Sequence, residues 1–312
     1  MSTSSEHPSA ADLATDGGCV ACIGVFDGVH RGHRALIDMA RTIADARDLP
    51  LVVITFDPHP MAVVAPDRVP TSLATLEVRE ELLLAAGADA VEVLPFDRAM
   101  AAMPPRQFVE RVLVGRLNVR EVVVGQDFRF GHRAAGTVDT LVAEGRELGF
   151  AVTVAPLVGD GSSRWSSTLA RDLISQGDIA AAAEVLGRAY RLDGVVVHGD
   201  HRGRQLGYPT ANLLLTGRPT VPADGVYAGW LGTRDGRHPA AISIGTNPQF
   251  AGVERRVEAY ALDRDDLDLY GQAVCLEFIE RLRGQMRFAD VGHLVAQMGD
   301  DVDRSRAILS RP

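Results

Sequence analysis

Five short apolar segments alternate with segments of helical period between residues 19 and 155, and this alternation restricts the fold more than any other feature of the chain. Helices are expected between neighbouring segments, near 32–46, 75–86, 106–116 and 138–147. A regular alternation of strands and helices predicts a parallel sheet with helices on both faces. The five segments are "CVACIGV", "LVVITF", "AVEVLPF", "EVVVG" and "FAVTVAP".

The pattern changes in the second half of the chain. After a helical stretch at about 168–187, short β-rich segments are separated by Gly, Pro, Asp and Asn, and an amphipathic helix is expected at about 289–309. This spacing predicts an antiparallel sheet or a small barrel, covered at one end by the helix. We therefore predict a disordered tail at 1–18, an α/β domain at 19–183 and a β domain at 184–312.

Charge excludes several classes of function. The net charge is −9, from 41 acidic and 32 basic residues, which argues against nucleic-acid or membrane-surface binding. All 32 basic residues are arginine, so the chain contains no lysine. This excludes the P-loop lysine, the strand lysine of protein kinases and a Schiff-base lysine. Any ATP chemistry must therefore use other groups.

The chain carries no sign of export or of membrane insertion. No apolar run approaches the roughly 18 residues of a membrane span, and residues 1–18 lack the apolar core of a signal peptide. The three cysteines, Cys19, Cys22 and Cys275, form no disulfide framework, which favours a reducing cytoplasm. Cys19 and Cys22 are expected on opposite faces of one strand, which argues against a shared metal or redox role.

The stretch "CIGVFDGVHRGHRALI", residues 22–37, places His30, Gly32 and His33 where the first strand passes into a helix. A helix amino end offers unpaired N–H groups and a partial positive charge, and Gly32 lets the backbone approach a phosphate. Imidazoles at 30 and 33 can then donate hydrogen bonds to phosphate oxygens. For this motif in isolation, a surface turn with two solvated histidines is the alternative.

A second motif, "RWSSTLAR" at 164–171, precedes another expected helix. Ser166, Ser167 and Thr168 are residue types that cap helices, and Arg171 lies one turn further along. Such a helix end suits a leaving pyrophosphate, although a capped helix with a solvated arginine is the alternative. Together the two motifs predict a phosphate clamp built from the first and last turns of one fold.

A third motif, "HGDHRGRQLGYPTAN" at 198–212, places three glycines among basic residues before a strand. Backbone N–H groups and arginine can surround a phosphate without lysine. Thr210 and Asn212 are alternate residues on one strand face and offer oxygen ligands to Mg²⁺. A glycine-rich hairpin is the alternative.

From residue 22 onward the chain resembles the bacterial bifunctional riboflavin kinase/FMN adenylyltransferases, also called FAD synthetases. The resemblance rests in the first half on "GVFDGVHRGH", "TFDPHP", "VVVGQDFRFG" and "RWSSTLAR", and in the second half on "GDHRGRQLGYPTAN" and "RRVEAYALD". It implies a Rossmann-like nucleotidyltransferase domain followed by a six-stranded β-barrel with a closing helix. It also implies a cytoplasmic enzyme that converts riboflavin to FMN and FMN to FAD, each with Mg-ATP, releasing pyrophosphate in the second reaction.

The resemblance further implies roles for single residues. His30 and His33 would steady the transition state of adenylyl transfer, Arg171 would bind the departing pyrophosphate, and Glu258 would act as general base on the ribityl 5′-hydroxyl. Mg²⁺ would be held by Thr210 and Asn212. Flavin contacts are implied for Phe56, His59, Asp127, Phe128 and Phe130. ATP or phosphate contacts are implied for Gly24, Phe26, Gly32, Arg164, Ser167, Thr168, Gly199, Gly203, Arg204 and Gly207.

Some positions depart from the family pattern, and two lie in the kinase half near the expected flavin: Gln249 and Gln285. These departures leave two alternatives: a paralogue acting on a flavin analogue, or a flavin-binding regulator whose catalysis has decayed. Retention of the histidine pair, Arg171 and Glu258 favours the enzyme. The expected partners are riboflavin, FMN and ATP, without nucleic acid or membrane, and the sequence leaves the oligomeric state open. The other two departures are Val25 and Ser243.

Overall fold

The computed structural model describes Leu13 and residues 17–161, 163–199, 206–246, 255–264 and 266–311. The chain forms two compact units, one of which comprises residues up to Pro70 together with Leu76–Ser166. The other comprises Thr71–Thr75 together with the residues from Ser167 onward. The domain limits at 18/19 and 183/184 stay predictions.

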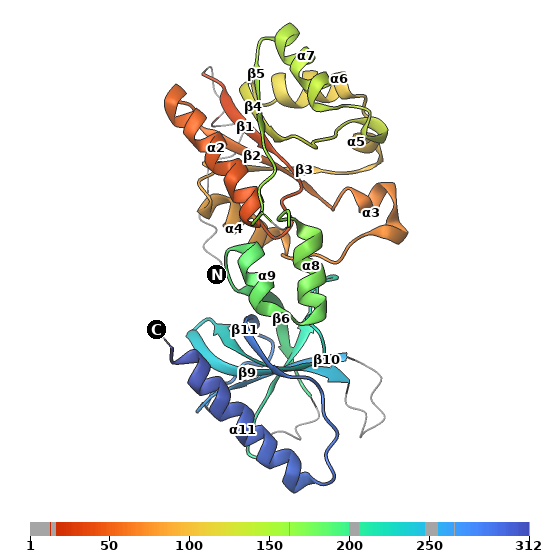
Figure 1. Ribbon diagram of the computed structural model, residues 1–312. Coiled ribbons are helices and arrows are strands. Elements are labelled where there is room, and N and C mark those ends of the chain that lie inside the picture. The colour runs from red at the N-terminus through yellow and green to blue at the C-terminus, as the bar shows by residue number, and fades with distance from the viewer. Residues whose placement is uncertain are drawn as a thin grey trace. The chain divides into compact units, whose positions relative to one another are not determined.

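The first unit is built on a five-stranded parallel sheet with the order β3-β2-β1-β4-β5 (Figure 1). All five residues of the central strand β1 are buried, as a strand covered on both faces requires. The strand order reverses between β1 and β4, and ligands of such sheets bind at the carboxyl ends beside this reversal. The strands are β1 (Cys19–Ile23), β2 (Leu51–Asp57), β3 (Ala90–Pro95), β4 (Val119–Gly125) and β5 (Ala151–Ala155).

Helices cover both faces of this sheet. Helices α2 (Arg31–Arg47) and α4 (Leu76–Ala85) share one apolar cluster with Cys22, whereas α7 (Val138–Leu148) shares the opposite cluster with Cys19. The two cysteines therefore lie on opposite faces, as their spacing predicts. The shorter helical segments are α3 (Met61–Val64), η1 (Pro66–Arg68), α5 (Arg98–Ala102), α6 (Pro105–Phe108), η2 (Val109–Val114) and η3 (His132–Ala134).

The helix expected at 106–116 is divided. A single turn of α-helix, α6, passes into the π-helical segment η2. The wider turn continues to its end, where the Gly115 N–H donates to the Glu110 carbonyl at 2.9 Å. A Cβ at position 115 would lie 3.0 Å from that oxygen, so glycine favours this close approach.

The second unit is a closed six-stranded barrel with the order β10-β7-β6-β11-β8-β9. It includes α8 (Ser167–Gln176) and α9 (Ile179–Leu186), which replace the single helical stretch expected at 168–187 because Gly177 adopts φ +81° and Asp178 caps the next helix. The strands are β6 (Tyr190–Val197), β7 (Ala211–Leu215), β8 (Gly225–Thr233), β9 (Gly236–Thr246), β10 (Arg255–Ala261) and β11 (Ala273–Arg283). The predicted fold class is confirmed in both halves.

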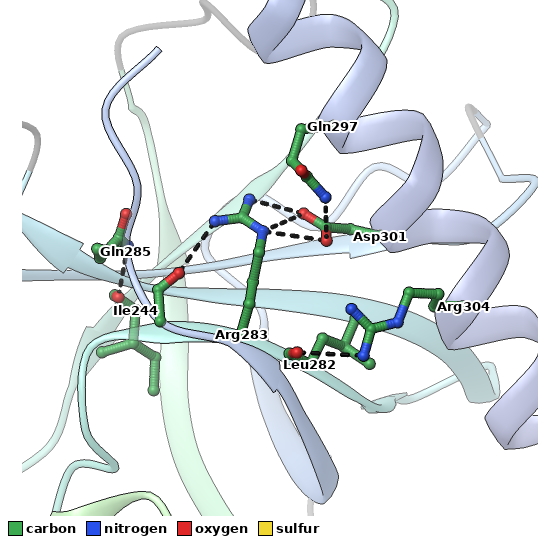
Figure 2. A network of polar contacts seen from close by, with 8 residues as sticks. Ile244, Leu282, Arg283, Gln285, Gln297, Asp301 and Arg304 are labelled. Atoms are coloured by element: carbon green, nitrogen blue, oxygen red, sulfur yellow. Dashed lines mark hydrogen bonds and ion pairs between the residues drawn. The ribbon is translucent and has the colours of Figure 1, made fainter.

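The closing helix α11 (Val291–Leu309) packs on the barrel through an apolar contact and a polar one. In the polar contact Arg283 at the end of β11 donates to both carboxylate oxygens of Asp301, with distances from 2.7 to 3.1 Å (Figure 2). Gln297 donates to the same carboxylate at 3.2 Å. The Asp301 side chain is only 5% exposed, so these donors take the place of water around the carboxylate. None of the helices in the described ranges combines the length and apolar character needed to span a bilayer.

We expect the Asp301→Asn variant to lose about 3–5 kcal/mol of unfolding free energy, because the Arg283 guanidinium keeps its charge without its counter-ion. Urea denaturation followed by circular dichroism measures this loss. Asp303→Asn on the same helix is the matched control, since Asp303 pairs with Arg306 in solvent and its loss is expected to leave unfolding unchanged. Equal effects of the two variants would contradict the assigned role of the buried pair.

Candidate functional site

The turn between β1 and α2 has an unusual backbone. Phe26, Gly28 and Val29 have φ values of +53°, +77° and +38°, in the left-handed region that β-branched residues such as Val29 rarely adopt. The turn is buried, which holds these conformations in place. Strained backbone of this kind persists where the surrounding structure fixes it, and it gathers at functional sites. The left-handed turn leads directly into the amino end of α2.

His30 caps helix α2 with its side chain. Its Nδ1 accepts a hydrogen bond from the backbone N–H of His33 at 3.3 Å, and the two rings stack with centroids 3.6 Å apart. Because Nδ1 is the acceptor, a neutral His30 carries its proton on Nε2. His30 is therefore a donor through Nε2, in a position that is only 6% exposed.

His33 lies in surroundings that suit an anion. Burial lowers the pKa of His33 well below its usual range, and the neighbouring His30 and Arg164 lower this pKa further. The His33 Nδ1 atom is buried and has no hydrogen-bond partner within the described part of the chain. A buried polar atom without a partner costs free energy that a ligand can recover.

A hairpin after β5 closes over the amino end of α2. Gly159 pairs with Arg164, and the Arg164 guanidinium contacts the Asp127 carboxylate at 2.6 Å. Trp165 lies next to it, with Arg31 at 5.3 Å from the ring centroid. A Cβ at position 32 would lie 3.4 Å from the Trp165 carbonyl oxygen and 3.0 Å from the His30 ring, so Gly32 also provides space for this packing.

The first unit thus gathers five of the residues implied by the resemblance: His30, Gly32, His33, Asp127 and Arg164. They follow the carboxyl ends of β1, β4 and β5 beside the reversal of strand order. Histidine, arginine and helix N–H groups here offer hydrogen-bond donors and positive charge to an anion without lysine.

The aromatic residues implied for flavin or ATP contacts are partly core residues. Phe26 is fully buried and meets the His33 ring edge-on, with centroids 5.1 Å apart, and its ring lies 3.1 Å from where a Cβ of Gly24 would stand. Phe128 stacks on the buried Phe130 at 5.5 Å. Their ligand contacts stay predictions. So do those of Phe56, which meets Phe96, and of His59, whose Nδ1 accepts from the Met61 N–H.

Ser167, Thr168 and Arg171 lie on α8 in the second unit. The Arg171 Nε donates to the carbonyl of Thr71 at 2.6 Å. Thr71 in turn shares a side-chain hydrogen bond of 2.8 Å with Thr220. Arg171 therefore has a fixed orientation within its own unit, and its meeting with the histidine pair of the first unit stays a prediction.

In the barrel, three polar residues stand opposite one another on adjacent strands. Glu258 on β10 pairs with Asn212 on β7 and with Ser243 on β9. Directly paired residues project to the same side of a sheet, so these side chains form one row. All three are half-buried, and their neighbours along the strands belong to the apolar barrel interior.

Thr210 and Asn212 line a pocket of about 100 Å³ together with Gly199 and residues of β10. Thr210 lies one residue before β7, so it is not a strand residue as expected, yet both residues line the same pocket. A Cβ at position 199 would lie 2.2 Å from the Asn212 amide nitrogen, so only glycine leaves Asn212 in place. Gly207 is exposed with φ +87°. Gly203 and Arg204 lie outside the described residues.

Gln285, one of the departures from the family pattern, has a structural partner. Its amide nitrogen donates to the Ile244 carbonyl on β9 at 2.8 Å (Figure 2). A carboxylate could not make this donation. Gln285 therefore supports the strand that faces Glu258, while Gln249 lies outside the described residues.

Two features of the first unit escape prediction from sequence. The Trp165 ring lies under the Arg31 guanidinium beside the histidine pair, although the motif "RWSSTLAR" draws attention to its serines. Arg79 on α4 is buried at the carboxyl ends of β1 and β2, with 7% exposed. The sequence offers one indication that Arg79 is buried: it is a charged residue at an apolar position of the helical pattern "TLEVREELLL".

The lowered pKa of His33 predicts a pH dependence of stability. The folded protein keeps His33 neutral below pH 6.5, the ordinary value, whereas the unfolded chain takes up a proton there. The part of the unfolding free energy that comes from a neutral His33 is thus fully present above about pH 6.5, and it is lost as the pH falls toward the lowered pKa. The His33→Asn variant should lose less stability than the native protein between about pH 7.5 and about pH 5.5.

Urea denaturation of both proteins across this range measures the difference, and subtracting the variant removes the contribution of other groups. Identical pH slopes would contradict the lowered pKa.

Addition of pyrophosphate should move the native His33 ring resonances in NMR spectra and raise the pKa of His33, because an anion favours the charged ring.

Comparisons with known proteins agree with this geometry. The FAD synthetase family model matches residues 12–169, and the riboflavin kinase family model matches residues 186–309. The chain is 39% identical over 285 residues to the bifunctional riboflavin kinase/FMN adenylyltransferase of Escherichia coli strain K12, covering 91% of this chain and 90% of the relative. The Listeria monocytogenes serovar 1/2a protein of the same description is 35% identical over 309 residues, covering 98% and 97%.

A solved crystal structure, described as a macrolide-efflux protein from Streptococcus pneumoniae, has the same overall fold. It superimposes with a TM-score of 0.84 at 32% sequence identity, covering 96% of this chain and 97% of that chain. Both halves of the sequence, both folds and both sets of relatives therefore agree, and the chain belongs to the family of bifunctional riboflavin kinase/FMN adenylyltransferases.

Proposed function

We propose that this chain carries both activities of its family at separate sites. Riboflavin is phosphorylated to FMN at the barrel, and FMN is joined to the AMP moiety of ATP at the carboxyl ends of the parallel strands to give FAD and pyrophosphate. The observation that carries the proposal is the separation of two different constellations. A histidine pair on a helix amino end lies in one unit, and an Asn–Glu row beside a pocket lies in the other.

In the first unit, a phosphate oxygen of FMN attacks the α-phosphorus of ATP, and the bond to pyrophosphate breaks. His30 donates to an ATP phosphate oxygen through Nε2, and His33 does so through Nδ1, an atom with no hydrogen-bond partner among the described residues. The amino end of α2 adds N–H groups and its partial positive charge. Arg164 neutralises the phosphates from the hairpin side.

We assign the departing pyrophosphate to Ser167, Thr168 and Arg171, in keeping with the resemblance. The first turn of α8 carries hydroxyl and N–H donors, and the bond from the Arg171 Nε to the Thr71 carbonyl sets the orientation of the Arg171 guanidinium. Phe128 and the loop bearing His59 are assigned to the flavin.

In the second unit, Glu258 accepts the proton of the ribityl 5′-hydroxyl as its oxygen attacks the γ-phosphorus of ATP, and ADP leaves. The row on adjacent strands holds Glu258 beside Asn212, so base and phosphate-side ligand keep a fixed separation. The glycine-rich segment around Gly199 and Gly207 is assigned to the ATP phosphates.

Thr210 and Asn212 fit a magnesium ion bound to ATP. Both offer neutral oxygens at one pocket, which suits Mg²⁺ because it keeps several water and phosphate ligands. The Asn212 amide occupies the space where a side chain at position 199 would lie, so a glycine at 199 is needed to keep Asn212 in this position. When bound, the ion neutralises charge on the phosphates. We further propose that the enzyme works in the cytoplasm on riboflavin, FMN and ATP, without nucleic acid or membrane partners.

The two activities should be lost separately. We expect Glu258→Gln to slow FMN formation by about 10²–10⁴-fold and to leave conversion of supplied FMN to FAD unchanged. His30→Asn should do the reverse, slowing FAD formation by about 10²–10³-fold without affecting FMN formation. Chromatography of riboflavin, FMN and FAD over time measures both rates, each activity serving as the folding control for the other. Loss of both activities in either variant would contradict separate sites.

Gly199→Ala tests the kinase pocket. The added methyl group displaces the Asn212 side chain, so we expect a higher KM for Mg-ATP in the kinase reaction with little change in thermal stability. Gly299→Ala in α11 is the matched control, because its Cβ would lie 3.6 Å from the Tyr208 hydroxyl, an ordinary contact. Kinase kinetics of the two variants compare the effects. An unchanged KM for Gly199→Ala would show that Asn212 does not contribute to the binding of Mg-ATP.

A further inference from the structure

Arg79 is a buried cation at the carboxyl ends of two central strands. Its Nη1 atom donates to the Val25 carbonyl at 3.0 Å and to the Phe56 carbonyl at 3.2 Å. The same atom lies 3.4 Å from the Thr55 hydroxyl, which itself donates to the Val25 carbonyl at 3.0 Å. A single nitrogen thus joins the end of β1 to the end of β2.

These carbonyls lie where the two strands separate. The last backbone hydrogen bond between them in the described structure runs from the Gly24 N–H to the Ile54 carbonyl at 3.1 Å. Beyond it, β1 enters the left-handed turn toward His30 and β2 enters the loop that carries His59. Arg79 replaces the hydrogen bonds that the separated strands no longer make to each other.

The charge of Arg79 is costly to bury and is partly compensated. Burial lowers the pKa of Arg79, while the carboxylates of Asp27 and Asp57 act in the opposite direction. The Asp57 carboxylate lies 3.9 Å from Nη2, and Asp27 is only 6% exposed in the turn. The Nε atom has no partner within the described part of the chain. Among the described residues, the hydrogen bonds of the Arg79 guanidinium are therefore made by Nη1.

We propose that Arg79 is a positioning residue for adenylyl transfer, which sets the ATP-binding turn after β1 and the flavin-side loop after β2 at a fixed separation. The proposal rests on the proposed function of the first unit. Arg79 acts through the Val25 and Phe56 carbonyls and does not touch the reacting atoms. Because both substrates depend on these two segments, loss of the link affects the binding of both.

The geometry predicts which replacement is tolerated. A lysine ammonium offers three donors at one point, and the contacts of Arg79 converge on one atom, so Arg79→Lys can keep them. Arg79→Met keeps the apolar stem and removes every donor. The chain contains no lysine, so the introduced residue gives a single side-chain signal after labelling with ¹⁵N-lysine.

Arg41→Met is the matched control. Arg41 also lies in the first unit and donates to two backbone carbonyls, those of Leu49 and Gly87. These carbonyls precede β2 and β3, at the opposite end of the sheet from the candidate site. Its loss should lower stability without changing the kinetics of either reaction.

The experiment measures kcat and KM of FAD formation from FMN and ATP in the full chain, with riboflavin phosphorylation as internal reference. For Arg79→Met we expect a higher KM for both ATP and FMN and a fall in kcat/KM of at least about tenfold, with the kinase reaction unchanged. A purely structural role would lower the active fraction and the melting temperature at an unchanged KM. Arg79→Lys should restore both KM values to within about threefold of the native ones.

Two further results keep the test decisive. The introduced lysine should show a protected ammonium resonance, because a buried and hydrogen-bonded ammonium exchanges slowly with water. If Arg79→Met does not fold, the KM values of a folded Arg79→Lys variant that shows this resonance decide the test. Native KM values in that variant support the proposal, and altered KM values overturn it. Unchanged KM values in a folded Arg79→Met variant overturn it as well. Absence of FAD formation by the native chain would instead overturn the proposed function.

Discussion

The passage of a fully buried strand directly into a helix is the constraint on which the first unit depends. Strand β1 has no exposed residue, so the chain must turn within a few residues to begin α2, and it does so through left-handed backbone at Phe26, Gly28 and Val29. That turn aims the amino end of α2 at the reversal of strand order. His30 caps this helix and orders His33, so the site's chemistry follows from the fold's connection.

The proposed phosphate sites of the two units use different groups, and neither contains lysine. The first combines a helix amino end, neutral imidazoles and Arg164, which together supply donors and positive charge. The second offers the Thr210 and Asn212 oxygens at one pocket and pairs Asn212 with Glu258 on adjacent strands, where register fixes their separation. Arginine makes directional contacts where lysine would act as a point charge, and this chain uses arginine at every such position.

Local patterns predicted what local interactions decide. The strand–helix alternation predicted the parallel sheet, and the odd spacing of Cys19 and Cys22 predicted their opposite faces. The motif at 22–37 predicted that the histidine pair lies where the first strand passes into a helix, but not that His30 caps that helix. The sequence did not reveal that α6 passes into a π-helical segment, because that depends on how the helix end packs. Nor did it reveal contacts between distant segments, such as Arg79 with Val25 and Phe56, Thr71 with Arg171, or Gln285 with Ile244.

The central claim is that one chain holds two independent catalytic sites, and mixing two variants tests it most directly. Glu258→Gln alone and His30→Asn alone should each convert riboflavin to FAD poorly, because each lacks one reaction. An equal mixture should form FAD from riboflavin at a rate approaching that of the native chain at the same site concentration, since FMN made by one variant is adenylylated by the other. A mixture that forms no more FAD than the separate variants would contradict the account.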